Sequence, residues 1–250
     1  MRRTILALLS VLIYLPVMAP AHFSAPASEE QTKVLQASKD NTLIEGPAGN
    51  ELSNGKGPVL FVGRTGQNKD NLRRGLIAFD IAGVIPSGSK ITSVNLKMKM
   101  TLSASGPQTA RITLHRLLSD WGEGESNSQG GRGAQAAEGD ATWLHPFYKA
   151  SEKRWSSPGG DFSPAESAAQ VVGDAGTYVW ASTPALVADV QTWLDSPKEN
   201  FGWLLLGDEA LEKGGTPKPT AKVFQSRNSN DESGRPQLTV SFIPPARQKK

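Results

Sequence analysis

Between residues 32 and 243 the chain is a succession of short runs of β-forming residues, each closed by Gly, Pro, Asn or Ser. The 250 residues include 25 Gly and 17 Pro, which interrupt regular structure and form tight turns. A chain broken this often is restricted to short strands, which are stable only when several of them share a core. We predict strands at 32–36, 42–45, 59–63, 74–80, 91–102, 111–117, 176–181, 202–206, 221–226 and 237–243.

One segment departs from this pattern. After Ser182-Thr183-Pro184 and before Pro197, apolar residues recur at helical spacing: Leu186, Val187, Val190, Trp193 and Leu194. This spacing predicts a single helix at one end or edge of the sheets. About ten strands and one short helix indicate an all-β fold, and we expect a two-sheet β-sandwich of the jelly-roll type.

The amino terminus has the features of an export signal. Arg2 and Arg3 precede an apolar stretch at residues 5–15, and Ala19-Pro20-Ala21 fits a cleavage site. We therefore predict a signal peptide at residues 1–21, with a second candidate cleavage site as late as residue 27. The apolar stretch is about half the length that a membrane-spanning helix needs, and no later segment approaches one. The sequence thus predicts a secreted protein, extracellular or periplasmic, with one domain at 33–243 and a basic tail at 244–250.

Charge and cysteine content exclude several classes of function. Without Arg2 and Arg3 the chain has 25 basic and 24 acidic residues, since the whole sequence has 27 and 24. A nearly neutral protein is not expected to bind nucleic acid, which requires a clearly basic domain. There is no Cys, so disulfides, thiolate nucleophiles and Cys-ligated zinc are excluded.

Two consecutive predicted strands, 91–102 and 111–117, alternate apolar with polar residues, so that each buries one face. If a hairpin centred on Gly106 joins them, Lys97 faces His115 and Lys99 faces Thr113, with Arg111 on the same outer face. This basic face is a candidate surface for an anionic ligand. The alternative is an ordinary solvated face whose charges prevent aggregation.

The segment from Ser119 to Gly176 shows little regular pattern and contains three of the six Trp residues. A loop of this length in a compact domain is typically functional or disordered. Trp rings can stack on the apolar faces of sugars, and they also anchor cores and loops. We expect Trp121 and Trp193 to lie in the core, and we retain Trp143 and Trp155 as candidate carbohydrate-binding residues.

No catalytic motif is recognisable: the sequence has no nucleophile elbow, no zinc-protease helix motif, no phosphate-binding loop and no dinucleotide fingerprint. Two carboxylates at a suitable separation would suffice to cleave a glycosidic bond, but a sequence cannot place them. Asp40, Asp120 and Glu123 near strand ends or loops are weak candidates for a structural Ca²⁺ site. The same acids could instead cap backbone groups or pair with Arg, so no cofactor is assigned.

Eight segments in order carry a resemblance to a known family. Four of them are ASKDNTLIEG (37–46), LFVGRT (60–65), RRGLIAFDIAGVIPSGSKITSVNLKM (73–98) and LHRLLSDWGEGESN (114–127). The others are GDATWLHPFY (139–148), WSSPGGDF (155–162), LVADVQTWLDSPKENFGWLLLGDE (186–209) and FQSRNSNDESGRPQLTVSF (224–242). Together they resemble the DNRLRE domain family, which is grouped with carbohydrate-binding module family 96. Relatives often have an acid where this chain has Asn228.

The resemblance implies a β-jelly-roll, bacterial secretion and, for some members, binding of an acidic polysaccharide such as alginate. We therefore expect a secreted, non-catalytic protein that binds a uronic-acid polysaccharide, with Lys97, Lys99, Arg111, His115, Trp143 and Trp155 as candidate contacts. Two alternatives remain open. One is a polysaccharide-degrading enzyme whose carboxylates are not recognisable, and the other is a structural or adhesion module associated with the cell surface.

Overall fold

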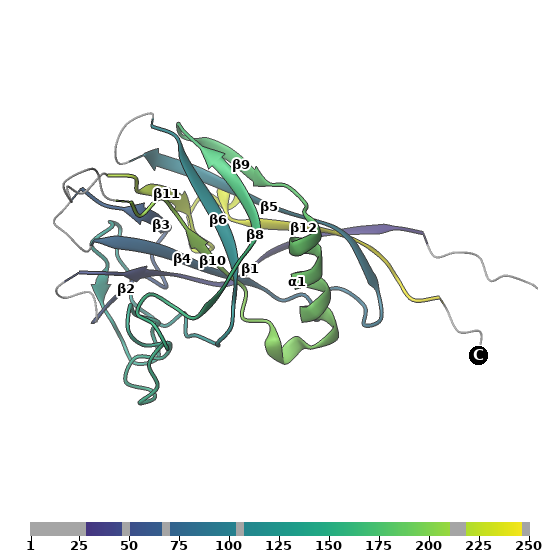
Figure 1. Cartoon of the computed structure of the whole chain (residues 1–250), viewed down its shortest axis with the longest axis horizontal. Helices are drawn as coiled ribbons and strands as arrows, with labels where there is room; N and C mark the ends of the chain where they lie inside the picture. The colour runs from purple at the N-terminus through teal and green to yellow at the C-terminus, as the bar shows by residue number, and fades with distance from the viewer. Residues whose placement is uncertain (1–28, 47–50, 67–70, 104–107, 211–218, 247–250) are drawn as a thin grey trace, which may run out of the picture.

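The computed structural model describes residues 29–46, 51–66, 71–103, 108–210 and 219–246 (Figure 1). The predicted signal peptide and the last four residues of the basic tail lie outside this part of the chain. The strands are β1 (Gln31–Ile44), β2 (Leu52–Ser53), β3 (Val59–Arg64), β4 (Leu72–Phe79), β5 (Lys90–Ser103), β6 (Ala110–Leu117), β7 (Ala134–Gln135), β8 (Phe162–Val172), β9 (Gly176–Trp180), β10 (Trp203–Leu206), β11 (Lys222–Gln225) and β12 (Gln237–Ile243). They are accompanied by the helix α1 (Pro184–Asp195) and by the 3₁₀ helices η2 (Pro197–Glu199) and η3 (Glu232–Gly234).

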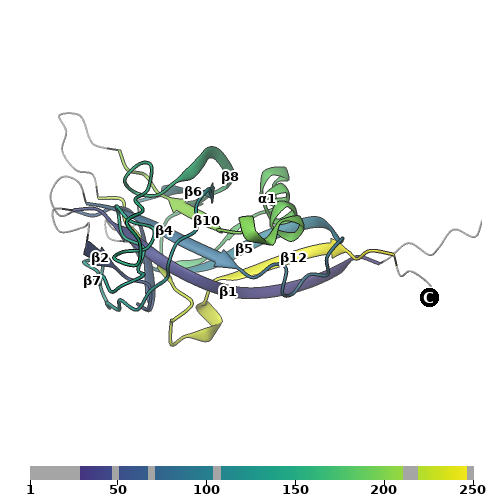
Figure 2. The same cartoon turned by 90° about the horizontal axis from the view of Figure 1, so that it is seen from below.

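Six strands form a closed ring of antiparallel neighbours, in the order β1, β12, β5, β11, β3, β4 and back to β1. β1 closes the ring because residues 31–36 pair with β12, whereas residues 37–44 pair with β4. The register shifts between Ala37 and Lys39, and a bulge of this kind lets a strand bend from one layer into the next. β1 and β12 run together along one side of the molecule (Figure 2).

The expected two-sheet sandwich is found only in part. The described chain is mostly β-strand with one α-helix, as predicted. However, β1 and β3 each belong to both layers, because β3 pairs with β11 through Val59–Val62 and with β4 through Gly63 and Arg64. The layers are therefore joined along two sides instead of forming separate sheets. Outside the ring, β10, β6 and β8 extend the layer from β4, and β9 pairs with β5.

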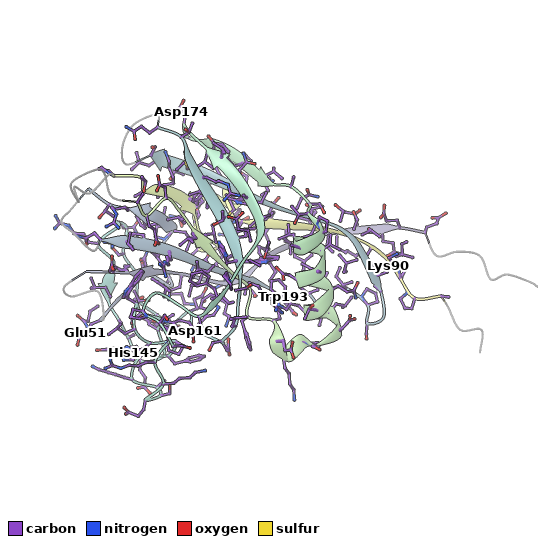
Figure 3. The ribbon with its side chains drawn as sticks, viewed as in Figure 1. Glu51, Lys90, His145, Asp161, Asp174 and Trp193 are labelled. Carbon is purple, nitrogen blue, oxygen red and sulfur yellow. The ribbon has the colours of Figure 1, made fainter. Side chains whose placement is uncertain are left out.

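The predicted helix is confirmed as α1. The Thr183 hydroxyl accepts a hydrogen bond from the Leu186 backbone N–H at 3.0 Å, and Pro184 occupies the first turn, where its missing N–H has no cost. The buried side chains of α1 are Leu186, Val190, Trp193 and Leu194; they join the main core cluster, and the helix packs against β5 and β8. Figure 3 shows Trp193 on the side of the helix that faces the strands. Among the described residues, no helix has the length and apolar character needed to cross a membrane.

Every predicted strand range overlaps a strand of the structure, and two of them are the halves of β1. β8, at Phe162–Val172, was not predicted. Its sequence lacks apolar alternation and contains Pro164, which is tolerated because β8 is hydrogen-bonded only to β6 and lies at the edge of its layer.

The predicted hairpin between β5 and β6 is wrong. β5 pairs with β12, β11 and β9, whereas β6 pairs with β10 and β8. Met98 and Met100 of β5 share one core cluster with Ile112 and Leu114 of β6, so the two strands face each other across the core. Alternation correctly indicates which side chains point inward, but it carries no information about the neighbouring strand.

Residues 118–161 form a long segment that covers the outer face of β4, β10 and β6. A second apolar cluster lies under this segment, and it contains Leu76, Leu204 and Leu117 from the strands together with Trp121, Trp143 and Trp155 from the segment. The outer face of this layer is therefore buried instead of solvated. The core positions predicted for Trp121 and Trp193 are confirmed, since both side chains are almost completely buried.

Candidate functional site

The cations of the predicted basic face do not share one surface. Lys99 Nζ lies 2.8 Å from Asp231 Oδ2, and its hydrogen bond holds the pKa of Asp231 below the usual range. Arg111 Nη1 donates to Glu166 Oε1 at 2.7 Å, which lowers the pKa of that exposed carboxyl. Lys97 lies opposite Gln237 of β12 and Val179 of β9 and is only partly exposed. The face therefore lies on separate strands, and two of its three cations are already paired.

His115 is not on an outer solvated surface as expected. It is buried under residues 162–163, because the first residues of β8 cover this side of β6. Nδ1 lies 2.9 Å from the Ser163 carbonyl oxygen and therefore donates to it, and Nε2 lies 2.9 Å from the Thr113 hydroxyl. Both ring nitrogens thus have partners inside the protein.

Trp143 and Trp155 are also buried. The Arg74 guanidinium lies 4.8 Å from the centroid of the Trp143 ring, and its Nε and Nη2 donate to the two carboxylate oxygens of Glu209 at 2.8 and 2.9 Å. Trp155 Nε1 donates to the Thr142 carbonyl oxygen at 2.9 Å. These contacts fix the long segment on the sheet. A carbohydrate-binding role for either Trp stays a prediction, and little of either ring is accessible.

Two of the candidate Ca²⁺ ligands, Asp40 and Glu123, meet in a cluster with two cations. Arg227 Nη1 donates to both carboxylate oxygens of Glu123 at 2.9 and 2.8 Å, and Lys56 Nζ lies 3.1 Å from Glu123 Oε2. The Arg227 backbone N–H donates to Asp40 Oδ2 at 2.6 Å. We call these four residues the Arg227 cluster. It joins β1, the long segment and the loop after β11, and it gives Arg227 a charge partner although residue 228 is Asn.

The Arg227 cluster does not have the character of a metal site. Asp40 is fully buried, and burial, assisted by the nearby Glu123 charge, raises its pKa to about 8. Glu123 is neutralised by cations, and Asp120 is turned toward Lys39 Nζ at 2.7 Å. Within the described residues, no group of three or more His, Asp or Glu side chains is placed to hold a metal ion.

A groove lies at another place, where the long segment meets β3, β5 and β11. Its volume is about 520 Å³, within the range of small-molecule sites. Phe61 and Val223 form an apolar floor, and Leu102 stands exposed at the side. The remaining lining residues are Thr65, Gly66, Ser128, Gly130, Gly131, Arg132 and Ala221. Of the described residues that line this Phe61 groove, only Arg132 is charged, and it is exposed.

The wall of the Phe61 groove is held in place by buried polar contacts. The Ser128 backbone N–H donates to Asn54 Oδ1 at 2.7 Å, and Arg73 Nε donates to the Gly131 carbonyl oxygen at 2.8 Å. Arg73 is buried, and burial lowers its pKa to about 10. A Cβ at Gly131 would lie 3.0 Å from the Phe61 ring, so this close approach favours glycine. The wall is therefore fixed before any ligand arrives.

Sequence reasoning did not identify the Phe61 groove. The only available signal was the Gly-rich stretch of the long segment, which was expected to be functional or disordered. Phe61 reads as an ordinary strand residue, and nothing in the sequence places Arg132 beside it.

Comparison with known proteins adds no identification. No protein-family model matches the chain, and no curated protein matches it at a significant level. The resemblance to the DNRLRE family therefore stays a prediction.

Proposed function

We propose that this chain is a secreted bacterial protein that binds an acidic polysaccharide without cleaving it, and that the Phe61 groove holds one sugar residue. One observation carries the proposal: a preformed groove combines an apolar floor, hydroxyl groups and a single cation. The C–H face of a sugar ring can pack against the exposed Leu102 side chain and the small accessible parts of Phe61 and Val223, and its hydroxyl groups can hydrogen-bond at the rim. The carboxylate of a uronic acid can pair with Arg132 through charge-assisted hydrogen bonds.

The proposal includes the jelly-roll class and the family membership that the sequence resemblance implies. Support comes from the course of the chain, in which β1 and β12 lie side by side while the consecutive strands β4, β5 and β6 alternate between the layers.

A binding role is favoured over glycoside cleavage by the state of Asp40 and Glu123, the two carboxyls of the Arg227 cluster. Asp40 is shielded from water, and Glu123 is held by Arg227 and Lys56. A glycosidase needs two carboxyls that both reach the substrate. Asp40 does not meet this requirement.

The test is to fill the groove without disturbing the fold. A Cβ at Gly130 would meet nothing within 4 Å, and its backbone is outside the left-handed region, so Gly130→Phe should fold normally. Gly176→Phe is the matched control, because a Cβ there makes only ordinary contacts and Gly176 does not line the groove. We expect Gly130→Phe to lower alginate affinity at least about tenfold, the change that loss of one sugar contact of about 1.4 kcal/mol produces.

Isothermal titration calorimetry with alginate, polygalacturonate and a neutral β-glucan measures this effect, and thermal melting checks the fold. Absence of binding by the wild-type protein to every glycan would overturn the proposal. Equal alginate affinity in the wild type and Gly130→Phe would overturn the assignment of the groove. Arg132→Gln tests the ligand class, since it should weaken binding of the two acidic polymers and leave neutral glycan binding unchanged.

A further inference from the structure

Most of the cations discussed above are paired with a carboxylate. Lys39, Lys56, Arg74, Lys99, Arg111 and Arg227 each lie within 3.1 Å of an Asp or Glu oxygen. In the long segment, by contrast, Lys149, Lys153 and Arg154 form no ion pair with any described residue. We call residues 149–154 the cationic turn.

The residues that flank the cationic turn are buried and hydrogen-bonded. Tyr148 and Trp155 on either side of it are buried, whereas all six residues between them are exposed. The Tyr148 backbone N–H donates to the Asp140 carbonyl oxygen at 2.8 Å, and the Trp155 N–H donates to the Leu144 carbonyl oxygen at 3.1 Å. The turn carries three cations and a single carboxylate, so it presents net positive charge to solvent.

The backbone at Lys149 is strained. Its φ is +54°, and it is the only non-glycine residue of the described chain with a positive φ. Lysine is unfavourable in this conformation, which glycine adopts freely. The Lys149 ammonium lies over the Tyr148 ring, 5.0 Å from the centroid. A non-glycine residue held in this conformation with an exposed side chain is a reason to consider a role for that side chain other than folding.

The neighbouring His145 responds to the charge of the turn. Its ring centroid lies 5.7 Å from that of Tyr148. Its pKa is lowered, first by burial and then by the positive charge of Arg154. The Glu152 carboxylate acts in the opposite direction and does not reverse the shift. The positive potential of the turn thus extends to the adjacent side chain. Figure 3 shows His145 among the loops at the lower edge of the molecule, away from α1.

We propose that the cationic turn is a second contact surface for the acidic polysaccharide, where Lys149, Lys153 and Arg154 pair with acidic groups of the polymer outside the sugar held in the groove. The proposal rests on the proposed function and adds a second contact site to the Phe61 groove. Each exposed pair is weak, so the turn acts through the repetition of charge along a polymer. An acidic monosaccharide gains little from it.

The experiment compares two triple variants with the same change in net charge. Lys149→Gln, Lys153→Gln and Arg154→Gln together remove the cations of the turn. Lys33→Gln, Lys90→Gln and Lys198→Gln remove three other exposed cations that form no ion pair with the described part of the chain. Titrations with alginate, a neutral β-glucan, duplex DNA and anionic vesicles are run at low and at physiological ionic strength, together with melting temperatures and with Gly130→Phe.

We expect the turn variant to bind alginate about tenfold more weakly at low salt, with a smaller salt dependence, because three exposed pairs are lost. Binding of the neutral glucan, and the affinity of the control variant for alginate, should not change. Equal alginate affinity in the two triple variants would overturn the role of the turn, even where Gly130→Phe shows that the groove binds. Tighter binding of DNA or vesicles than of alginate at the turn would overturn the ligand class. Absence of alginate binding by the wild type would refute the proposed function itself.

Discussion

Asp40 is a carboxyl group that folding removes completely from water. One of its oxygens, Oδ1, has no hydrogen-bond partner among the described residues, and the other accepts from the Arg227 backbone. Burial makes the charged form unfavourable, which is why the pKa rises from 3.8 to about 8. The group is therefore neutral in the folded protein at pH 7 and charged in the unfolded chain.

The stability of the protein should fall as pH rises from about 4 to about 8 because of Asp40. In this window the folded state binds one more proton than the unfolded state, so the free energy of unfolding decreases with pH by at most about 1.4 kcal/mol per pH unit. Above pH 8 this contribution is lost and the dependence stops. Asp40→Asn, which mimics the neutral form, should lack this decrease. Urea unfolding of both proteins between pH 5 and 9 measures it, and parallel profiles would contradict the raised pKa.

Lys149 provides a second test at the scale of one residue. Lys149→Gly relieves the positive φ and should stabilise the protein by up to about 1 kcal/mol, equivalent to a rise of roughly 2–4 °C in melting temperature. Lys149→Ala retains the strain and is the control. If the cationic turn binds polysaccharide, the same Gly variant should melt higher and bind alginate more weakly. A melting temperature at or below that of the wild type would show that the backbone is not strained.

At the scale of elements, residue patterns predict what a strand or helix buries but not its neighbours. The spacing of Leu186, Val190 and Trp193, between the start at 182–184 and Pro197, was sufficient to place α1. The alternation in β5 and β6 correctly assigned their inner faces and led to a wrong hairpin, because pairing depends on the path of the whole chain. β8 was missed because an edge strand buries few side chains and needs no alternation.

Trp193 is the residue of α1 on which we expect stability to depend most. Its side chain is fully buried, and its ring lies 4.5 Å from that of Trp203 in an edge-to-face arrangement. Trp193→Ala should therefore reduce the free energy of unfolding by roughly 3–5 kcal/mol. Trp193→Phe should cost far less, because most ring contacts persist and the indole N–H, which has no acceptor in the described part of the chain, is removed. Urea denaturation compares the two, and a loss below about 1 kcal/mol for Ala would contradict the packing.

At the scale of the whole molecule, the candidate site depends on contacts between segments far apart in the sequence. Phe61 and Arg132 line the same groove because Arg73 of β4 and Asn54, which follows β2, hold residues 128–131 in place. Lys99 and Arg111 are paired with Asp231 and Glu166, which reach them from other elements, and their role in binding stays a prediction. No periodicity or motif in the sequence indicates which residues of distant segments will lie together. The sequence therefore predicts the class of fold well and the location of a surface site poorly.

The stability of the ring of strands should depend on the first half of β1. A fragment of residues 29–246 should unfold in a single transition with the stability of the full chain. A fragment of residues 38–246 lacks the pairing of residues 31–36 with β12 and loses the buried Leu35. It should be less stable by at least about 3 kcal/mol, the cost of deleting a large core side chain alone. Circular dichroism during thermal unfolding distinguishes the two, and equal melting temperatures would show that the ring need not close.

The pairing of β1 with β12 also determines how the molecule resists force. The first residue of β1, Gln31, lies opposite Phe242 near the end of β12, so both ends of the fold are at the same place. The hydrogen bonds between antiparallel strands run perpendicular to the strands. Tension applied between the two ends would therefore break the pairs one after another, from Gln31 and Phe242 toward Gln36 and Gln237, instead of loading them together. A spacer held at both ends would open in this way under little load, whereas a module suspended from one end would not.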